Sequence, residues 1–373
     1  MANSPYSFAP DWSFWSRGVV RQFEPSTLIV TPAKLLRRGD RVMSAGSCFA
    51  ANIVPYLERS GFHYVRTETR HPLVRVPGEN FGYDNFSASY GNIYTARQLL
   101  QLLYRALDLW QPREDVWEID GEFVDPFRPG LRYRARSRAE FDLLTRQHLD
   151  CVRRAFTEAT VLIFTPGLTE AWVSRADGAV FPACPGTVAG EFDGSRHTFH
   201  NMSVSEVAGD LNEFIAEVRK LNSLLRIILT VSPVPLVATA TGGHVLPATI
   251  YSKSVLRVAV DEVVHANNDV SYFPAYEIVA GPQAPWEFFE PDRRNVSKAA
   301  VETVMGALFA NCEVLDSGRP RPLAPPVPQL PAMPDQRRNQ VLSQMIATVE
   351  CEEAMIDVAP NGPSPASFIR EPS

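Results

Sequence analysis

The sequence predicts an α/β protein: a three-layer α/β/α sandwich built around a mostly parallel sheet, with small β-hairpin insertions. Short apolar runs alternate with long stretches of helical periodicity through most of the chain. The apolar runs are continuous rather than alternating, which is typical of parallel strands buried on both faces. The runs predicted as strands are residues 41–45, 62–66, 160–165, 226–231 and 270–273.

Paired polar residues predict where several helices begin. In a capping box, a Ser or Thr hydroxyl and a Glu or Gln three residues later satisfy each other's backbone N–H groups at a helix start. Such pairs are Thr95/Gln98, Ser137/Glu140 and Ser203/Glu206. Apolar residues at helical spacing follow each pair, so we expect helices at about 99–107, 141–156 and 207–221.

Two Asp-Gly pairs predict tight turns. Asp120-Gly121 and Asp177-Gly178 each lie between strand-like segments. Asp-Gly suits a two-residue hairpin because both positions accept a positive φ. We therefore expect two small antiparallel hairpins inserted in the main fold, and a last helix of the fold at about 296–309.

Composition narrows the class of protein. The net charge of −6 argues against a nucleic-acid partner. No run of about 18 apolar residues predicts a membrane span, and the N-terminus lacks a basic region followed by an apolar one. The five cysteines are odd in number and lack metal-ligand spacing. We expect a cytoplasmic protein with no metal.

The chain divides into three predicted regions. Residues 1–30 form an N-terminal arm, and 31–315 form the main domain. Residues 316–373 form a tail that is dense in proline between Arg319 and Pro334 and carries one helix at about 336–354. Pro-rich segments are extended linkers or dock protein partners, and both roles stay open for this tail.

The most informative motif is a turn. Gly46-Ser47-Cys48 lies directly between the first predicted strand and a helix-like stretch. Such a turn lifts a side chain above the sheet and aims free helix N–H groups at whatever binds there. With Phe49 and Ala50 the turn spells Gly-Ser-Cys-Phe-Ala, which resembles the signature of the GSCFA family, a branch similar to the SGNH (GDSL-type) hydrolases. The resemblance spans about residues 30–312 and implies that fold and a hydrolase activity.

The resemblance places two nucleophiles in competition. The Gly-Asp-Ser of SGNH hydrolases overlays Gly46-Ser47-Cys48, which implies Cys48 as the nucleophile. A thiol at a helix N-terminus is acidified and attacks as a thiolate, whereas Ser47 needs a paired base. The alternative is a tight turn chosen for packing, with Cys48 an inert buried thiol.

Two further segments resemble the SGNH oxyanion blocks. Residues after the strand at 160–165 place Gly167, Thr169 and Glu170 where the Gly-x-Asn-Asp block stands. This implies Thr169 or a backbone N–H as oxyanion donor and Glu170 as the group that orients a base. The alternative is a helix start capped by Thr169. Gly91-Asn92 resembles the block that contributes a Gly N–H, with a plain loop as its alternative.

The general base is harder to assign. The SGNH ending Asp-x-x-His appears here as Asp292 to Asn295, and an Asn cannot accept a proton at neutral pH. His244 lies in a loop after the strand at 226–231, hence at the active end of the sheet, and is the first candidate. His200 is the second, and Asp292 is expected to orient either histidine.

These residues predict acyl transfer without a metal or organic cofactor. The first hypothesis is an SGNH-like esterase that cleaves an O-acyl ester of a carbohydrate or another small molecule. The second is an acyltransferase or thioesterase that uses Cys48. The third is a non-catalytic binding module on the same fold, for which Asn295 is the main argument.

Overall fold

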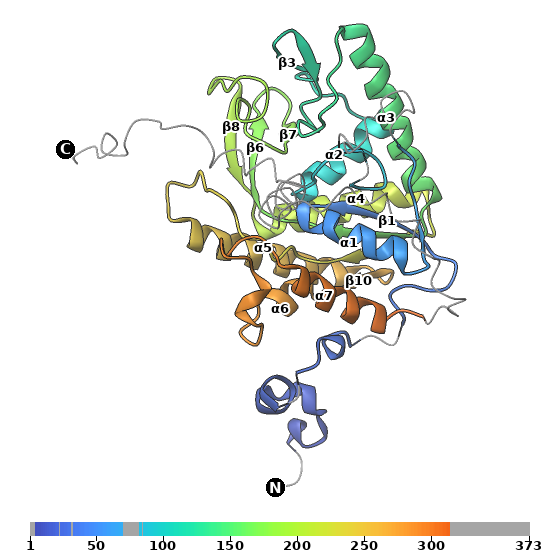
Figure 1. Cartoon of the computed structure of the whole chain (residues 1–373), viewed down its shortest axis with the longest axis vertical. Helices are drawn as coiled ribbons and strands as arrows, with labels where there is room; N and C mark the ends of the chain where they lie inside the picture. Colours follow the sequence, from blue (N-terminus) through green and yellow to red (C-terminus); the bar gives the residue numbers. More distant parts are fainter. Residues whose placement is uncertain (1–3, 22, 31–32, 70–81, 84, 314–373) are drawn as a thin grey trace, which may run out of the picture.

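The computed structural model of the 373-residue chain describes residues 4–21, 23–30, 33–69, 82–83 and 85–313. This part has the predicted α/β fold, with a five-stranded sheet between two layers of helices (Figure 1). The predicted tail and its helix lie outside the described residues.

The main sheet is parallel throughout and has the strand order β10-β9-β5-β1-β2. Every residue of β5 is buried, which explains why its sequence is a continuous apolar run. All of the strands predicted for this sheet are present, but the pairing at 62–66 is limited to two residues. The strands are β1 (Arg41–Gly46), β2 (His63–Tyr64), β5 (Val161–Thr165), β9 (Arg226–Leu229) and β10 (Val270–Tyr272).

Two apolar clusters join the sheet to its helices. One cluster combines sheet residues with α2 (Ala96–Ala106), α3 (Arg138–Glu158), α4 (Val204–Leu221) and α5 (Val245–Ala266). The other lies on the opposite face and includes α1 (Cys48–Arg59), α6 (Ala275–Ala280) and α7 (Lys298–Ala310).

The predicted helix starts are confirmed. Reciprocal capping boxes begin α2 at Thr95 and α4 at Ser203. Ser137 caps α3 by accepting the Glu140 N–H, although Glu140 itself turns to the Arg136 N–H. These contacts span only a few residues, which is why the sequence reveals them.

Both predicted hairpins form. β3 (Trp117–Ile119) and β4 (Glu122–Val124) pair through a turn in which Asp120 and Gly121 both have positive φ, at 52° and 79°. Asp177-Gly178 lies between β6 (Glu170–Ser174) and β7 (Val180–Phe181), which are also antiparallel.

One alternative for residues 169–170 is wrong. A helix does not begin there, because Glu170 is the first residue of β6. Strand β8 (His197–Asn201) pairs with β6 along its full length and completes a three-stranded antiparallel sheet. This pairing joins segments far apart in the sequence, so local polarity did not reveal it.

The first part of the N-terminal arm leads away from the body of the protein (Figure 1), whereas its end lies against α7, where Asn311 Nδ2 donates to Ser26 O at 3.0 Å. Its short helices contain no buried residue. They are η1 (Pro5–Phe8), η2 (Asp11–Ser13), η3 (Trp15–Arg21) and η4 (Pro25–Leu28); a further short helix, η6 (Trp286–Phe288), precedes α7. No helix in the described ranges has both the length and the apolar character to cross a membrane.

The strand order indicates where a ligand binds. After β1 the chain adds β2 on one side of the sheet and then β5, β9 and β10 on the other. In open α/β sheets, ligands occupy the crevice outside the carboxyl ends of the strands where this reversal occurs. The crevice expected here lies between the ends of β1 and β5, at Gly46 and Thr165.

Candidate active site

The turn after β1 requires glycine at its first position. Gly46 has φ +149°, and a Cβ added there would lie 2.5 Å from the Thr165 carbonyl oxygen. Hydrogen bonds then hold the turn on both sides: the Ser47 N–H donates to Thr165 O at 3.1 Å, and the Ile93 N–H donates to Gly46 O at 2.8 Å. The end of β1 is therefore fixed against β5 and against the segment that precedes α2.

Ser47 occupies the N-cap position of α1 but does not cap the helix. Its side chain accepts no N–H from the first turn. The residue is 2% exposed, and its Oγ has no hydrogen-bond partner among the residues that the structure describes. A capping serine contributes about 1 kcal/mol, and a buried unpaired hydroxyl costs about 1–3 kcal/mol. The fold gains no stability from this hydroxyl, which is the pattern of a functional side chain.

Two more unpaired hydroxyls lie at the ends of neighbouring strands. Thr165 is the last residue of β5, and Thr230 directly follows β9. Both are buried, and neither Oγ1 has a partner in the described part of the chain. No motif in the sequence singles them out. Their signal would have been a hydroxyl residue at the carboxyl end of an apolar strand.

Cys48 begins α1 directly beside Ser47. The residue is 8% exposed and belongs to the apolar cluster that also contains Tyr94, Leu168 and Val234. This position agrees with both predicted readings of Cys48, a thiol at a helix N-terminus and a small packed side chain.

Gly167 brings the loop after β5 against Ser47. A Cβ on Gly167 would lie 3.1 Å from the Ser47 Cβ, and the Gly167 N–H donates to Tyr94 O at 2.8 Å. Tyr94 and Leu168, the residue that follows Gly167, line a cavity of about 220 Å³. Other lining residues include Glu170, Trp172, Cys184, Phe199 and Thr239. The Gly167-Leu168 segment therefore contacts both the Gly46-Ser47-Cys48 turn and the lining of this cavity.

Thr169 and Glu170 already have partners within the protein. The Thr169 N–H donates to Ser252 Oγ at 2.9 Å, and its hydroxyl donates to Asn201 Oδ1 at 2.6 Å. The Glu170 carboxylate accepts from the Thr239 hydroxyl at 2.6 Å and from the Ala240 N–H at 3.1 Å. Glu170 thus holds the loop that leads to His244.

The two histidine candidates are bound elsewhere. His244 is the exposed N-cap of α5, where its Nδ1 accepts the Leu246 N–H at 3.1 Å. This hydrogen bond places the proton of the neutral ring on Nε2, so neither nitrogen acts as a base in this conformation. His200 lies on β8, with Nε2 2.7 Å from Glu206 Oε1.

Asp292 pairs with the residue that replaces the expected histidine. Its Oδ2 accepts from Asn295 Nδ2 at 2.6 Å, and its Oδ1 accepts the Arg294 and Asn295 N–H groups, each at 2.9 Å. In the part of the chain that the structure describes, the hydrogen bonds of Asp292, His200 and His244 do not reach the turn. Their predicted catalytic roles stay predictions.

Gly91 and Asn92 are the remaining predicted oxyanion donors, and their backbone leads directly to a residue that binds the turn. Gly91 has φ +69° and Asn92 follows it, directly before the Ile93 N–H that holds Gly46. Asn92 lines a small hollow together with Gln98. The structure therefore brings Gly46, Ser47, Gly167 and the Gly91-Asn92 segment to one place.

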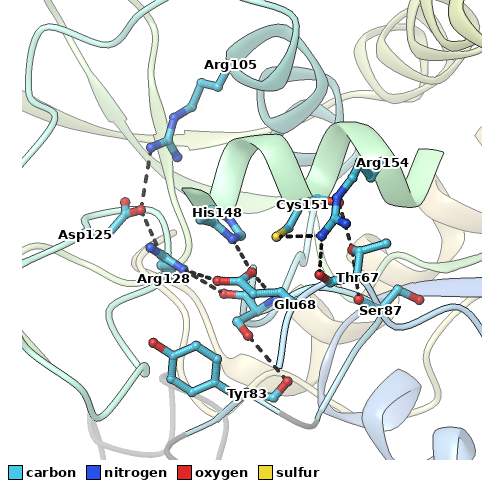
Figure 2. Close-up of polar contacts among 11 residues, drawn as sticks. Thr67, Glu68, Tyr83, Ser87, Arg105, Asp125, Arg128, His148, Cys151 and Arg154 are labelled. Carbon is cyan, nitrogen blue, oxygen red and sulfur yellow. Dashed lines mark hydrogen bonds and ion pairs between the residues drawn. The ribbon is translucent and has the colours of Figure 1, made fainter. Parts of the chain in front are cut away.

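The structure also contains a buried charge cluster that the sequence does not reveal (Figure 2). The His148 Nδ1 lies 2.7 Å from Glu68 Oε2, and Arg128 binds both Glu68 at 3.4 Å and Asp125 at 3.0 Å. Arg105 lies 3.6 Å from Asp125. The five residues come from distant segments, and no motif in the sequence unites them.

The charges of this cluster balance. Burial raises the pKa of Glu68, but His148, Arg128 and the Ser89 N–H outweigh it and hold that pKa at about 2. Burial and Arg128 lower the pKa of His148, which is neutral at pH 7 and donates its Nδ1–H to Glu68. Two guanidiniums therefore face two carboxylates.

The cluster borders a cavity of about 320 Å³, which is larger than the cavity beside the turn. Size alone does not make it the better candidate. Its charged wall residues, Glu68, Asp125 and Arg128, are ion-paired with one another, whereas the Ser47 hydroxyl has no described partner. We therefore assign the candidate active site to the turn. No group of three or more His, Cys, Asp and Glu side chains in the described segments is arranged to hold a metal ion.

Comparison with known proteins agrees with the motif. The model of the GSCFA family matches residues 41–308. No curated protein matches the chain in sequence.

Several solved structures are similar at low TM-scores. A carbohydrate esterase family 3 protein from Talaromyces cellulolyticus has a TM-score of 0.35 and 10% identity, covering 73% of this chain and 95% of its own. A carbohydrate esterase family 2 enzyme with a carbohydrate-binding domain, from Corynascus thermopiles (Myceliophthora fergusii), has a TM-score of 0.28 and 12% identity, covering 75% and 68%. The salicylyl-acyltransferase SsfX3 of a tetracycline biosynthetic pathway has a TM-score of 0.24 and 13% identity, covering 42% and 38%.

Proposed function

The chain belongs to the GSCFA family, and on that premise we propose that it hydrolyses an ester (O-acyl) bond by nucleophilic acyl transfer from the Gly46-Ser47-Cys48 turn. The observation that carries the proposal is the Ser47 hydroxyl, which is buried at the N-terminus of α1 without capping it. Its place at the strand-order reversal supports the same conclusion.

In the proposed reaction a base takes the proton of the Ser47 hydroxyl, or of the Cys48 thiol, as that atom attacks the ester carbonyl. The tetrahedral intermediate expels the alcohol, which receives the proton from the base. Water then attacks the acyl-enzyme by the same steps and releases the acid. The reaction as proposed uses no metal or organic cofactor.

Backbone N–H groups of the first turn of α1 are the proposed oxyanion donors. The first N–H groups of a helix point toward its N-terminal end, although the Ala50 N–H of α1 already donates to Ser47 O at 2.8 Å. Thr169 is a weaker candidate in this conformation because both of its donors are used internally. Each oxyanion donor is worth on the order of 3 kcal/mol, about a hundredfold or more in turnover.

His244 remains the proposed base. This role requires the ring to release the Leu246 N–H so that one nitrogen can accept the proton of the nucleophile. We expect His244→Gln to lower kcat by about a hundredfold and His200→Gln to leave kcat within about twofold. A measurement of p-nitrophenyl acetate hydrolysis by both variants decides this, and equal rates for the two would remove His244 from the mechanism.

The deciding experiment labels the nucleophile. The full-length protein and its Ser47→Ala and Cys48→Ala variants are treated separately with a fluorophosphonate and with iodoacetamide, mapped by mass spectrometry, and assayed with p-nitrophenyl acetate. Cys312→Ser is the matched control, because Cys312 does not line the cavity beside the turn and burial raises the pKa of its thiol to about 11, which should leave it unreactive.

Fluorophosphonate on Ser47 that tracks loss of the esterase rate supports the serine mechanism. Iodoacetamide on Cys48 that tracks the same loss supports a cysteine mechanism, and with it the acyltransferase or thioesterase alternative. If neither reagent labels the turn and no turnover is measured, the proposal is contradicted. That result favours the binding module, for which the Asp292–Asn295 pair is the structural argument.

A further inference from the structure

We propose that Ser252 and Lys253, neighbours on α5, are positioning residues that hold the loop at residues 166–169 against Ser47. The inference deepens the proposed ester hydrolase and rests on it. Both side chains are buried, and both form a hydrogen bond with the backbone of this loop.

Lys253 binds the loop from inside the protein. The residue is 1% exposed, and its Nζ donates a hydrogen bond to the Gly167 carbonyl oxygen. Burying an ammonium group is costly unless hydrogen bonds compensate it, so packing alone would be better served by an apolar side chain at this position. We therefore infer that the amino group of Lys253 is needed for its hydrogen bond to the Gly167 carbonyl.

Ser252 holds the same loop two residues further on. It is fully buried, and its Oγ accepts the Thr169 N–H at 2.9 Å. Adjacent residues of a helix point about 100° apart. Because two adjacent side chains both bind it, the loop follows the surface of α5 rather than meeting it at one point.

Backbone hydrogen bonds hold the first two residues of the loop as well. Pro166 O accepts the Ser232 N–H at 3.0 Å, and the Gly167 N–H donates to Tyr94 O at 2.8 Å. With Lys253 on its carbonyl, Gly167 is bound through both backbone groups while its Cα side faces Ser47.

A shift of this loop would move one wall of the nucleophile site. Misplacement of catalytic groups by about 1 Å is enough to lower turnover by about a hundredfold. A buried pair that fixes such a wall from behind is the support that a functional site needs. Ser252 and Lys253 therefore act on catalysis through Gly167 and Thr169.

The test compares Lys253→Met and Ser252→Ala with Val260→Ala in the full-length protein. Val260 is a fully buried residue of the same helix within its apolar cluster, so it controls for lost stability alone. We measure the melting temperature, kcat, KM and the pH profile with p-nitrophenyl acetate, and amide hydrogen exchange of residues 166–171.

The proposal expects Lys253→Met and Ser252→Ala to lower kcat by about tenfold or more with KM changed less than threefold, and to speed exchange of the loop amides. The pH profile keeps its shape, and Ser252→Thr, which retains the hydroxyl, recovers most of kcat. Val260→Ala lowers the melting temperature but keeps kcat within about twofold.

Wild-type turnover that survives unchanged in both variants overturns the positioning role. Loss of one limb of the pH profile in Lys253→Met also overturns it, because the lysine would then exchange a proton with the reacting atoms. A wild-type protein without turnover contradicts the proposed function instead, and the exchange of residues 166–171 still shows whether the pair holds the loop.

Discussion

Gly46 and Ser47 are neighbours at the end of β1, but different constraints explain them. The backbone angle and the approach of Thr165 exclude any side chain at position 46. At position 47 no structural constraint demands a hydroxyl, because the Oγ neither caps α1 nor binds another described group. Sterics therefore account for the glycine, and the proposed chemistry accounts for the serine.

Gly46→Ala should be strongly destabilising. The new Cβ would lie 2.5 Å from Thr165 O and 2.9 Å from Thr165 Cβ, at φ +149°. Backbone strain of about 1–3 kcal/mol adds to overpacking of similar size, so we expect a loss of about 3 kcal/mol or more in urea unfolding. Gly306→Ala in α7 is the control. No atom crowds the position of the new Cβ, so alanine should raise the free energy of unfolding by about 0.5–1 kcal/mol. Equal midpoints for the two variants would contradict the geometry described for the turn.

At the scale of elements, the residues at the N-cap positions differ in whether they stabilise their helices. Thr95 and Ser203 begin α2 and α4 with complete capping boxes. Ser47 occupies the same position of α1 without forming one. Three hydroxyl residues at the same helix position therefore differ in what they contribute, and Ser47 also lacks the Glu or Gln three residues later that completes a capping box.

This difference predicts opposite effects of one substitution. Ser203→Ala should lower the free energy of unfolding by about 1 kcal/mol, because it leaves the Glu206 N–H of α4 without its side-chain acceptor. Ser47→Ala should cost nothing or stabilise the protein, because it removes a buried hydroxyl that has no described partner. Urea unfolding of both variants measures this, and a cost of 1 kcal/mol at Ser47 would show that its hydroxyl is structural after all.

Element boundaries in the sequence were predictable where the contacts are local. Capping pairs and Asp-Gly turns involve residues at most four apart, so their signals are complete within a short window. Strand β6 was not predictable in this way, because its identity depends on pairing with β8, about 30 residues later in the chain.

At the scale of the whole molecule, the buried charge cluster ties distant segments together. Arg105 belongs to α2, His148 to α3, and the other members lie in loops. The partners Glu68 and His148 are 80 residues apart in the sequence. Because every member is at most 6% exposed in its side chain, the cluster acts as a polar core that depends on all of its charges.

The cluster makes stability depend on pH. The pKa of His148 is lowered in the folded protein, so below about pH 6.5 the unfolded chain binds the proton more readily and stability falls as pH falls, by up to about 1.4 kcal/mol per pH unit. The pKa of Glu68 is lowered to about 2, so a second loss follows between pH 4.5 and about 2. Urea unfolding from pH 7 to 5 should show this slope, and His148→Gln should flatten it. An unchanged slope in the variant would exclude His148 as its source.

Breaking the cluster should lower the free energy of unfolding far more than breaking an ion pair on the surface does. Arg128→Met leaves Glu68 and Asp125 buried without their shared cation, and we expect a loss of about 3–5 kcal/mol. Arg138→Met is the matched control, because Arg138 also binds two carboxylates but is 48% exposed, and it should cost no more than about 1 kcal/mol. Similar losses for both would mean that burial does not set the strength of these pairs.

The amino-acid sequence by itself determined the fold class, the strands of the main sheet, the helix starts and the position of the Gly46-Ser47-Cys48 turn, since each is encoded by neighbouring residues. Only the tertiary structure decided that the Ser47 hydroxyl lacks a described partner and that Lys253 reaches Gly167. Periodicity and capping are short-range, whereas hydrogen-bond satisfaction depends on groups that folding brings together from 80 or more residues away, as Thr169 and Ser252 show.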